Sequence, residues 1–308
     1  APVFFRNQPL GCTATIIYQL FEENRQPIPE NIAGILCAAI LSDTLLYRSP
    51  TCTDVDRQAA DKLANIAGIN VEEHARQMVQ YWTLAGLMVV NSLTVTLTVI
   101  GTMVTDKADH KLRSFYTTPV SKLTVAISYI ISAVLIGFFF CTITLAGYLV
   151  YIFMTGGELI SIGAVLQVLG LTFVNVIIFS MLMYLVALFV KSSSAWGGIG
   201  TVVGTLVGFL GAIYVPLGAL PASVAKVLKC LPVLHSTALM RKAMCEESMV
   251  ATFTNMPNEV LQVYRDEMGI DVVVKSQILS EKFHLLFLVI CGMIAVSAIA
   301  IVGKKKEQ

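Results

Sequence analysis

Two short polar strings carry the residues that could do chemistry in this chain. The first ends an apolar helical pattern with Ser42-Asp43-Thr44. A carboxylate at the end of such a helix is stabilised when a cation meets it, so Asp43 is a candidate metal ligand. Asp43 could also lie exposed at the helix end or pair with Arg48, and spacing alone does not separate these interpretations.

The second string runs from Asp106 to Lys122 and reads DKADHKLRSFYTTPVSK. Leu112, Phe115 and Tyr116 stand at positions i, i+3 and i+4, which predicts an apolar face on a charged helix that ends before Pro119. Such a face binds either the lipid surface or a protein partner. The pattern by itself leaves both interpretations open.

The composition bounds the classes of protein to which these strings can belong. The chain has 308 residues, of which 56% are hydrophobic and 13% charged, and soluble domains average about 25% charged residues. The sequence therefore predicts an integral membrane protein. A net charge of +1 excludes nucleic-acid binding through a broad basic surface.

Five apolar segments are long enough to cross a bilayer, whose core of about 30 Å requires about 20 helical residues. They cover roughly residues 82–104, 123–153, 161–190, 195–216 and 283–303. Amides inside these segments are expected to form hydrogen bonds between helices; they are Asn91, Gln167 and Asn175. We therefore expect a mainly α fold, with a polytopic helical domain of about five spans over residues 80–308.

Lysine and arginine in the short loops predict the orientation of the spans. Basic residues follow the first, third and fifth spans, at Lys107, Lys111, Arg113, Lys122, Lys191 and Lys304 to Lys306. These places are expected to be cytoplasmic, which puts residues 1–79 and the loop 217–282 on the outer side. Within that loop, short amphipathic helices are predicted after Pro221 and from Pro257 to Met268.

Residues 1–79 have the mixed composition of a soluble α/β protein. They begin with an extended stretch, Val3-Phe4-Phe5, and continue with four helical patterns. The patterns cover residues 11–24, 29–46, 54–67 and 71–80. We expect this segment to be part of a larger α/β domain.

Residues 81–308 resemble the permease subunit of ABC-2 type exporters, because Thr118-Pro119-Val120-Ser121-Lys122 matches the loop signature of that family. The resemblance implies a multi-pass plasma-membrane subunit without a cofactor, which pairs with a second permease subunit, identical or different. It also implies that residues 106–122 couple to a separate ATPase. The implied coupling residues are Lys107, Lys111, Leu112, Arg113, Phe115, Tyr116 and Pro119. The family's earlier span and large outer segment find no match before residue 82.

Residues 1–79 resemble the N-terminal DHH domain of manganese-dependent (family II) inorganic pyrophosphatases, which are cytosolic enzymes. The strings Pro9 to Thr15 and Ala39 to Thr53 carry this resemblance. It implies that Asp43 is a ligand of a Mn²⁺ pair that activates water for attack on phosphorus. The remaining ligands of that family find no match among the residues of this chain, so we expect an incomplete metal site.

Three hypotheses follow. The first is the permease subunit of an ABC-2 exporter, which depends on a separate ATPase because the sequence contains no G-x-x-x-x-G-K-[ST] string. The second is a manganese-dependent inorganic pyrophosphatase represented by a fragment. The third is a junction of two partial reading frames near residue 80, since both resemblances are partial and the predicted outer location of residues 1–79 conflicts with a cytosolic family.

Overall fold

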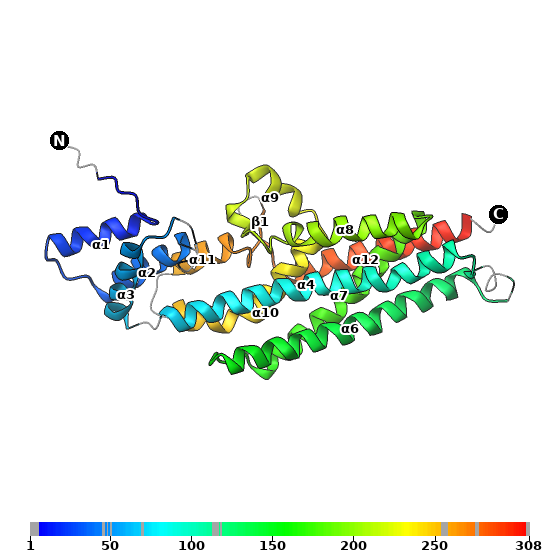
Figure 1. Cartoon of the computed structure of the whole chain (residues 1–308), viewed down its shortest axis with the longest axis horizontal. Helices are drawn as coiled ribbons and strands as arrows, with labels where there is room; N and C mark the ends of the chain where they lie inside the picture. The colour runs from blue at the N-terminus through cyan, green and yellow to red at the C-terminus, as the bar shows by residue number, and fades with distance from the viewer. Residues whose placement is uncertain are drawn as a thin grey trace. The chain divides into compact units, whose positions relative to one another are not determined.

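The computed structural model of this chain describes residues 6–44, 47, 49, 51–68, 71–112, 117, 119–253, 258–274 and 277–305. It is mainly α-helical and divides into two compact units (Figure 1). Unit 1 comprises residues 1–80 and 247–264, and unit 2 comprises residues 81–246 and 265–308. Each unit is described by itself.

Three of the four helical patterns predicted for residues 1–79 are confirmed as separate helices. They are α1 (Thr13–Glu23), α2 (Glu30–Asp43) and α3 (Asp54–Ala67). The fourth pattern belongs to α4 (Val71–Ala108), which continues into the first predicted span because neither Gly nor Pro occurs from residue 71 to residue 85. The predicted extended stretch, Val3 to Phe5, lies outside the described residues.

A buried carboxylate joins the beginnings of α1 and α3. Asp56 has no exposed surface and accepts hydrogen bonds from the Gly11 amide at 2.9 Å, the Thr15 hydroxyl at 2.5 Å and the Thr53 amide at 2.8 Å. Burial by itself raises the pKa of Asp56, but the hydrogen bonds from Thr15 and Thr53 outweigh it and lower the pKa below its ordinary value. Asp56 thereby also completes the capping box of α3.

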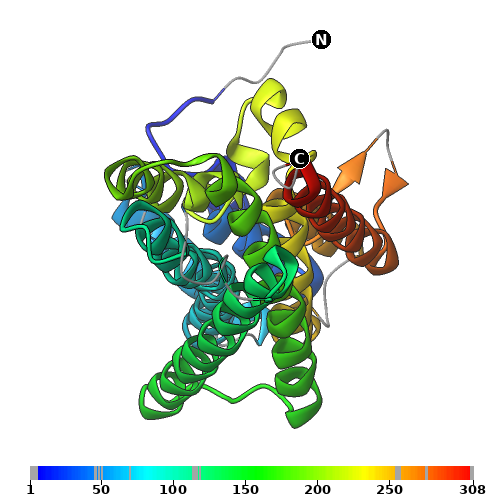
Figure 2. The ribbon, with the colours of Figure 1, turned by 90° about the vertical axis from the view of Figure 1, so that its right-hand side faces the viewer.

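Among the residues that the structure describes, five helices are long and apolar enough to cross a membrane, which is the number that the sequence predicts. The apolar stretches are Gln77–Ala108, Lys122–Met154, Ile162–Phe189, Ser193–Leu210 and Glu281–Val302. They belong to α4, α6 (Lys122–Met154), α7 (Ile162–Phe189), α8 (Ser193–Leu210) and α12 (Glu281–Lys305). Helix α7 packs against both α6 and α12, as the view along the bundle shows (Figure 2).

Helix α8 ends at Leu210, six residues before the predicted end at 216. The chain reverses there, because the amides of Ile213 and Tyr214 both donate to the Gly208 carbonyl, at 2.7 and 3.2 Å. A Cβ atom on Gly208 would lie 2.2 Å from the Tyr214 ring, so a larger residue at position 208 would displace that exposed ring.

The segment 217–282, predicted to be an outer loop, contains more structure than the sequence predicts. The predicted short helices are confirmed as α9 (Ala222–Leu228) and α11 (Asn258–Glu267). The remaining elements are η1 (Leu217–Ala219), α10 (Pro232–Phe253) and the antiparallel pair β1 (Val273–Val274) and β2 (Gln277–Ile278). Helix α10 was not predicted, and its side chains from Val233 to Met240 are all buried. A helix buried on all sides lies inside a protein and not at its surface.

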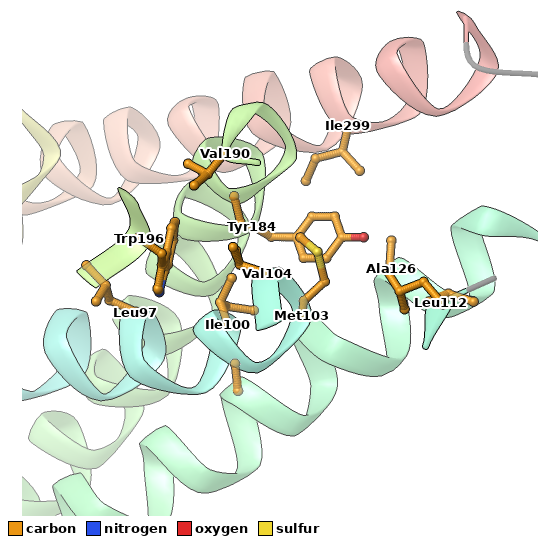
Figure 3. Close-up of a cluster of buried hydrophobic side chains, with 13 residues drawn as sticks. Leu97, Ile100, Met103, Val104, Leu112, Ala126, Tyr184, Val190, Trp196 and Ile299 are labelled. Atoms are coloured by element: carbon orange, nitrogen blue, oxygen red, sulfur yellow. The ribbon is translucent and has the colours of Figure 1, made fainter. Parts of the chain in front are cut away.

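All five spans contribute to one cluster of buried side chains (Figure 3). The labelled members include Ile100 of α4, Ala126 of α6, Tyr184 of α7, Trp196 of α8 and Ile299 of α12. Within the cluster, a Cβ atom on Gly101 would lie 2.5 Å from the Trp196 indole nitrogen. Glycine at position 101 therefore allows α4 and α8 to pack closely.

Candidate functional site

The charged segment 106–122 begins at the end of α4, where Lys107 holds that helix to α7. The Lys107 ammonium donates to the carbonyls of Leu188 and Val190 at 3.2 and 3.0 Å. These carbonyls belong to the last turn of α7 and to its C-cap residue, where intrahelical donors are lacking. A cation also complements the negative end of the helix dipole. Lys107 therefore fixes the position at which the charged segment leaves the bundle.

Asp106 makes a second attachment, to α6. Its carboxylate accepts a hydrogen bond from the Tyr129 hydroxyl at 2.7 Å and lies 3.4 Å from the Lys111 ammonium. Lys111 also lies 3.2 Å from Asp109, and 61% of its side chain is exposed. Hydrogen bonds with Asp109 and Asp106 raise the pKa of Lys111, so it is cationic throughout the neutral range. Asp106 is thus held by the bundle, while Lys111 projects into solvent.

Leu112 points into the bundle and not toward a partner. It is 5% exposed and belongs to the buried cluster with Met103, Val104 and Ala126 (Figure 3). Pro119 is exposed. The other members of the predicted apolar face and its basic flank lie outside the described residues; they are Arg113, Phe115 and Tyr116. Among the predicted coupling residues described by the structure, Lys107 and Leu112 are therefore anchors, and Lys111 and Pro119 face outward.

A buried arginine of α10 joins segments of unit 2 that are distant in sequence. Arg241 of α10 has no exposed surface, and its guanidinium donates to the carbonyls of Met268 and Ala212 at 3.0 and 2.6 Å. The same guanidinium lies over the Trp82 ring of α4, 4.2 Å from its centroid. The Trp82 indole in turn donates to the Met268 carbonyl at 3.0 Å. The sequence carries no clear signal for this cluster, because Arg241 lies next to Lys242 in a helix of mixed polarity.

Two further contacts tie α10 and the segments around it together. Arg265 forms ion pairs with Glu246 at 2.9 Å and with Asp271 at 2.8 Å. The Ser236 hydroxyl donates to the side-chain carbonyl of Asn175 in α7 at 2.9 Å. The expected interhelical role of Asn175 is thus confirmed, and Asn91 of α4 likewise donates to Thr144 of α6 at 2.7 Å.

The predicted metal ligand of unit 1 lies at the last residue of α2. The Asp43 side chain is exposed and interacts with the thiol of Cys12. Burial, together with the hydrogen bond to Asp43, raises the pKa of Cys12 to about 12, so this neighbour is a neutral thiol. In the part of the chain that the structure describes, His, Cys, Asp and Glu form no group of three that could hold a metal ion. These residues do not fit a Mn²⁺ pair.

Comparison with known proteins gives two similarities. The family model described as ABC-2 family transporter protein matches residues 26–302. It begins before residue 81, where the resemblance to permeases was expected to start. The match therefore covers most of the chain and extends into α12, the last helix of unit 2.

The second similarity covers about a quarter of the chain. The probable manganese-dependent inorganic pyrophosphatase of Shouchella clausii is 54% identical over 79 residues, which are 26% of this chain and 25% of that protein. That of Enterococcus faecalis is 50% identical over 82 residues, 27% of each protein. The manganese-dependent inorganic pyrophosphatase of Bacillus subtilis is 48% identical over 79 residues, 26% of each. The chain thus spans about a quarter of the length of these relatives.

Proposed function

The chain belongs to the ABC-2 family of transporter proteins, and on this basis we propose that it is the membrane-spanning permease subunit of an exporter in the plasma membrane. A separate ATPase supplies the energy, since the sequence has no phosphate-binding G-x-x-x-x-G-K-[ST] string. The segment 106–122 receives that ATPase.

The observation that carries this proposal is that some residues of the segment are anchored to the helices while Lys111 is exposed. Lys107 is bound to the end of α7, Asp106 is bound to α6, and Leu112 is packed in the core shared by the five spans. Lys111 projects from this fixed base. An exposed tip on a rigid base transmits a displacement to the helices, whereas a loosely attached loop would absorb it.

Photo-crosslinking in membranes tests this docking role, with a photo-crosslinking amino acid placed at position 111 of the full chain. The matched control places it at position 226, where an exposed lysine lies on α9 of the outer loop. We expect crosslinks from position 111 to a protein that carries a P-loop, and none from position 226. Crosslinks to lipid alone at position 111 would refute the docking role and favour an interfacial segment.

A second permease subunit is the other partner that we propose, with α8 as the contact. This helix is the least apolar of the five spans, and most of its residues are not buried by the rest of the chain. Its exposed residues include Gly197, Thr201 and Thr205, whose small side chains permit close approach of a second helix. Crosslinking of a single cysteine at position 201 tests this contact, with position 139 on exposed Phe139 of α6 as control.

The pyrophosphatase hypothesis is supported by the 48–54% identity over about 80 residues. It is the weaker candidate, because the donors near Asp43 do not fit a metal pair and the similarity covers a quarter of those enzymes. We therefore propose transport, and not diphosphate hydrolysis, as the activity of this chain.

A further inference from the structure

Two buried histidines from different elements of unit 2 contact each other directly. His235 of α10 and His284 of α12 are 1% and 4% exposed, and their Nδ1 atoms lie 2.7 Å apart. The other ring nitrogen of His235, Nε2, lies 3.0 Å from the carbonyl oxygen of Lys229. Both distances are those of hydrogen bonds.

These distances determine where the hydrogens are when both rings are neutral. The Lys229 carbonyl can only accept, so Nε2 of His235 carries a hydrogen. Nδ1 of neutral His235 is then an acceptor, and Nδ1 of His284 must donate to it. Nε2 of neutral His284 is therefore the nitrogen without a hydrogen.

The pair can take up one proton without losing a hydrogen bond, but it cannot take up two. A proton on Nε2 of His284 leaves both bonds in place. A second proton has only Nδ1 of His235 to occupy, which would set two N–H groups against each other at 2.7 Å and place two cations side by side. The second protonation must separate the rings.

The surroundings oppose charge on the pair at neutral pH. The His235 ring stacks on Phe287 at 4.1 Å between centroids, and burial lowers the pKa of His235 below its ordinary value. The charged groups that face the pair are Lys242 and Glu281, which form an ion pair at 3.1 Å, and Asp271, which is held by Arg265 at 2.8 Å. Both carboxylates are engaged with cations, which limits how far they can favour a histidine cation.

We propose that His235 and His284 form a proton-binding site that holds α10 against the start of α12 when neutral or singly protonated and releases it when doubly protonated. The ligand is the proton itself. Acidification thus loosens the attachment of the outer loop to the last span.

Hydrogen–deuterium exchange of the full chain in lipid nanodiscs tests the proposal. Exchange is measured between about pH 7.5 and about pH 5, a range that brackets the ordinary histidine pKa and stays above those of free carboxylates. After correction for intrinsic pH dependence, we expect exchange of residues 232–240 and 281–287 in the wild type to rise by about tenfold at the acidic end. An unchanged wild-type exchange rate would overturn the proposal whatever the variants do.

Substitutions test whether the acid-induced rise in exchange originates at the histidine pair. In His284→Asn, the amide can donate to neutral His235 or, after rotation, accept from protonated His235, so we expect neutral-pH protection with no acid response. His284→Gln serves as a second variant if the first does not fold. Glu281→Gln removes one of the two carboxylates that face the pair, and its acid response should equal that of the wild type. An acid response that persists in His284→Asn, or disappears in Glu281→Gln, would contradict the assignment to the histidine pair.

Discussion

Within each unit, one buried polar residue joins several segments of the chain. Arg241 and Asp56 both have no exposed surface, and each satisfies several backbone groups at once. Burying such a group is unfavourable unless its hydrogen bonds are complete, so each network is sensitive to the loss of its centre. The predicted ligand Asp43 differs, because it is exposed and its neighbour is a neutral thiol.

Arg241→Gln is expected to destabilise unit 2 strongly. Hydrogen bonds to a charged group contribute about 1.5–3 kcal/mol each, and the substitution weakens those to the Ala212 and Met268 carbonyls and removes the cation from the Trp82 ring. Thermal unfolding of the detergent-purified chain measures the effect. Lys226→Gln on exposed α9 is the control, and equal melting temperatures for the two variants would count against the network.

Asp56→Asn is expected to loosen α1 and α3 above about pH 4. The folded-state pKa of Asp56 lies below its unfolded value, so its stabilising contribution is present above the unfolded pKa and is lost as the pH falls through the folded pKa. Hydrogen exchange of residues 13–23 and 54–67 should therefore be faster in the variant at neutral pH and converge with the wild type in acid. Asp54→Asn, at an exposed position of the same first turn, should behave as the wild type.

Phosphate release from pyrophosphate in the presence of Mn²⁺ tests whether Asp43 belongs to a working metal site. We expect no turnover above background for either the wild type or Asp43→Ala, because no described group of three ligand-type side chains exists to hold the metal pair. Turnover in the wild type that Asp43→Ala abolishes would restore the pyrophosphatase hypothesis.

Helices with long apolar runs could be predicted from the sequence, whereas a helix of mixed polarity could not. The five spans were predicted because long uncharged runs in a chain of this composition have few alternatives to crossing a bilayer. Helix α10 was missed because His235, Ser236 and Arg241 interrupt its apolar pattern. Their partners are His284, Asn175 and the Ala212 carbonyl, at positions that local periodicity cannot reveal. The early end of α8 depends likewise on the contact of Gly208 with Tyr214.

The charged segment was only half predictable for the same reason. Its composition indicated an exposed apolar face, but burial of Leu112 depends on residues of α4 and α6 that surround it. Leu112→Ala should leave a cavity and lower stability by about 2–5 kcal/mol. Val120→Ala, at a 41% exposed position of the same segment, should change stability little. Chemical denaturation in detergent measures the stability of both variants. Equal losses of stability in Leu112→Ala and Val120→Ala would mean that Leu112 faces outward.

For the whole molecule, the family match and the pyrophosphatase similarity concern different activities. The match begins at residue 26, inside the stretch 1–79 whose strings resemble the pyrophosphatases. The chain is a membrane protein by its family and its five apolar helices. The predicted junction near residue 80 stays a prediction, and one continuous DNA read across the codons for residues 75–90 tests it.

The most direct test of the central claim is energy coupling through the segment 106–122. The chain is co-purified from membranes and reconstituted with the P-loop subunit captured by the crosslink at position 111, and ATP hydrolysis is measured with and without the chain. We predict that the wild type and Lys226→Glu stimulate hydrolysis, and that Lys111→Glu loses stimulation while its melting temperature is unchanged. Equal stimulation by Lys111→Glu, or none by the wild type, would contradict the assignment of this segment as the site that receives the ATPase.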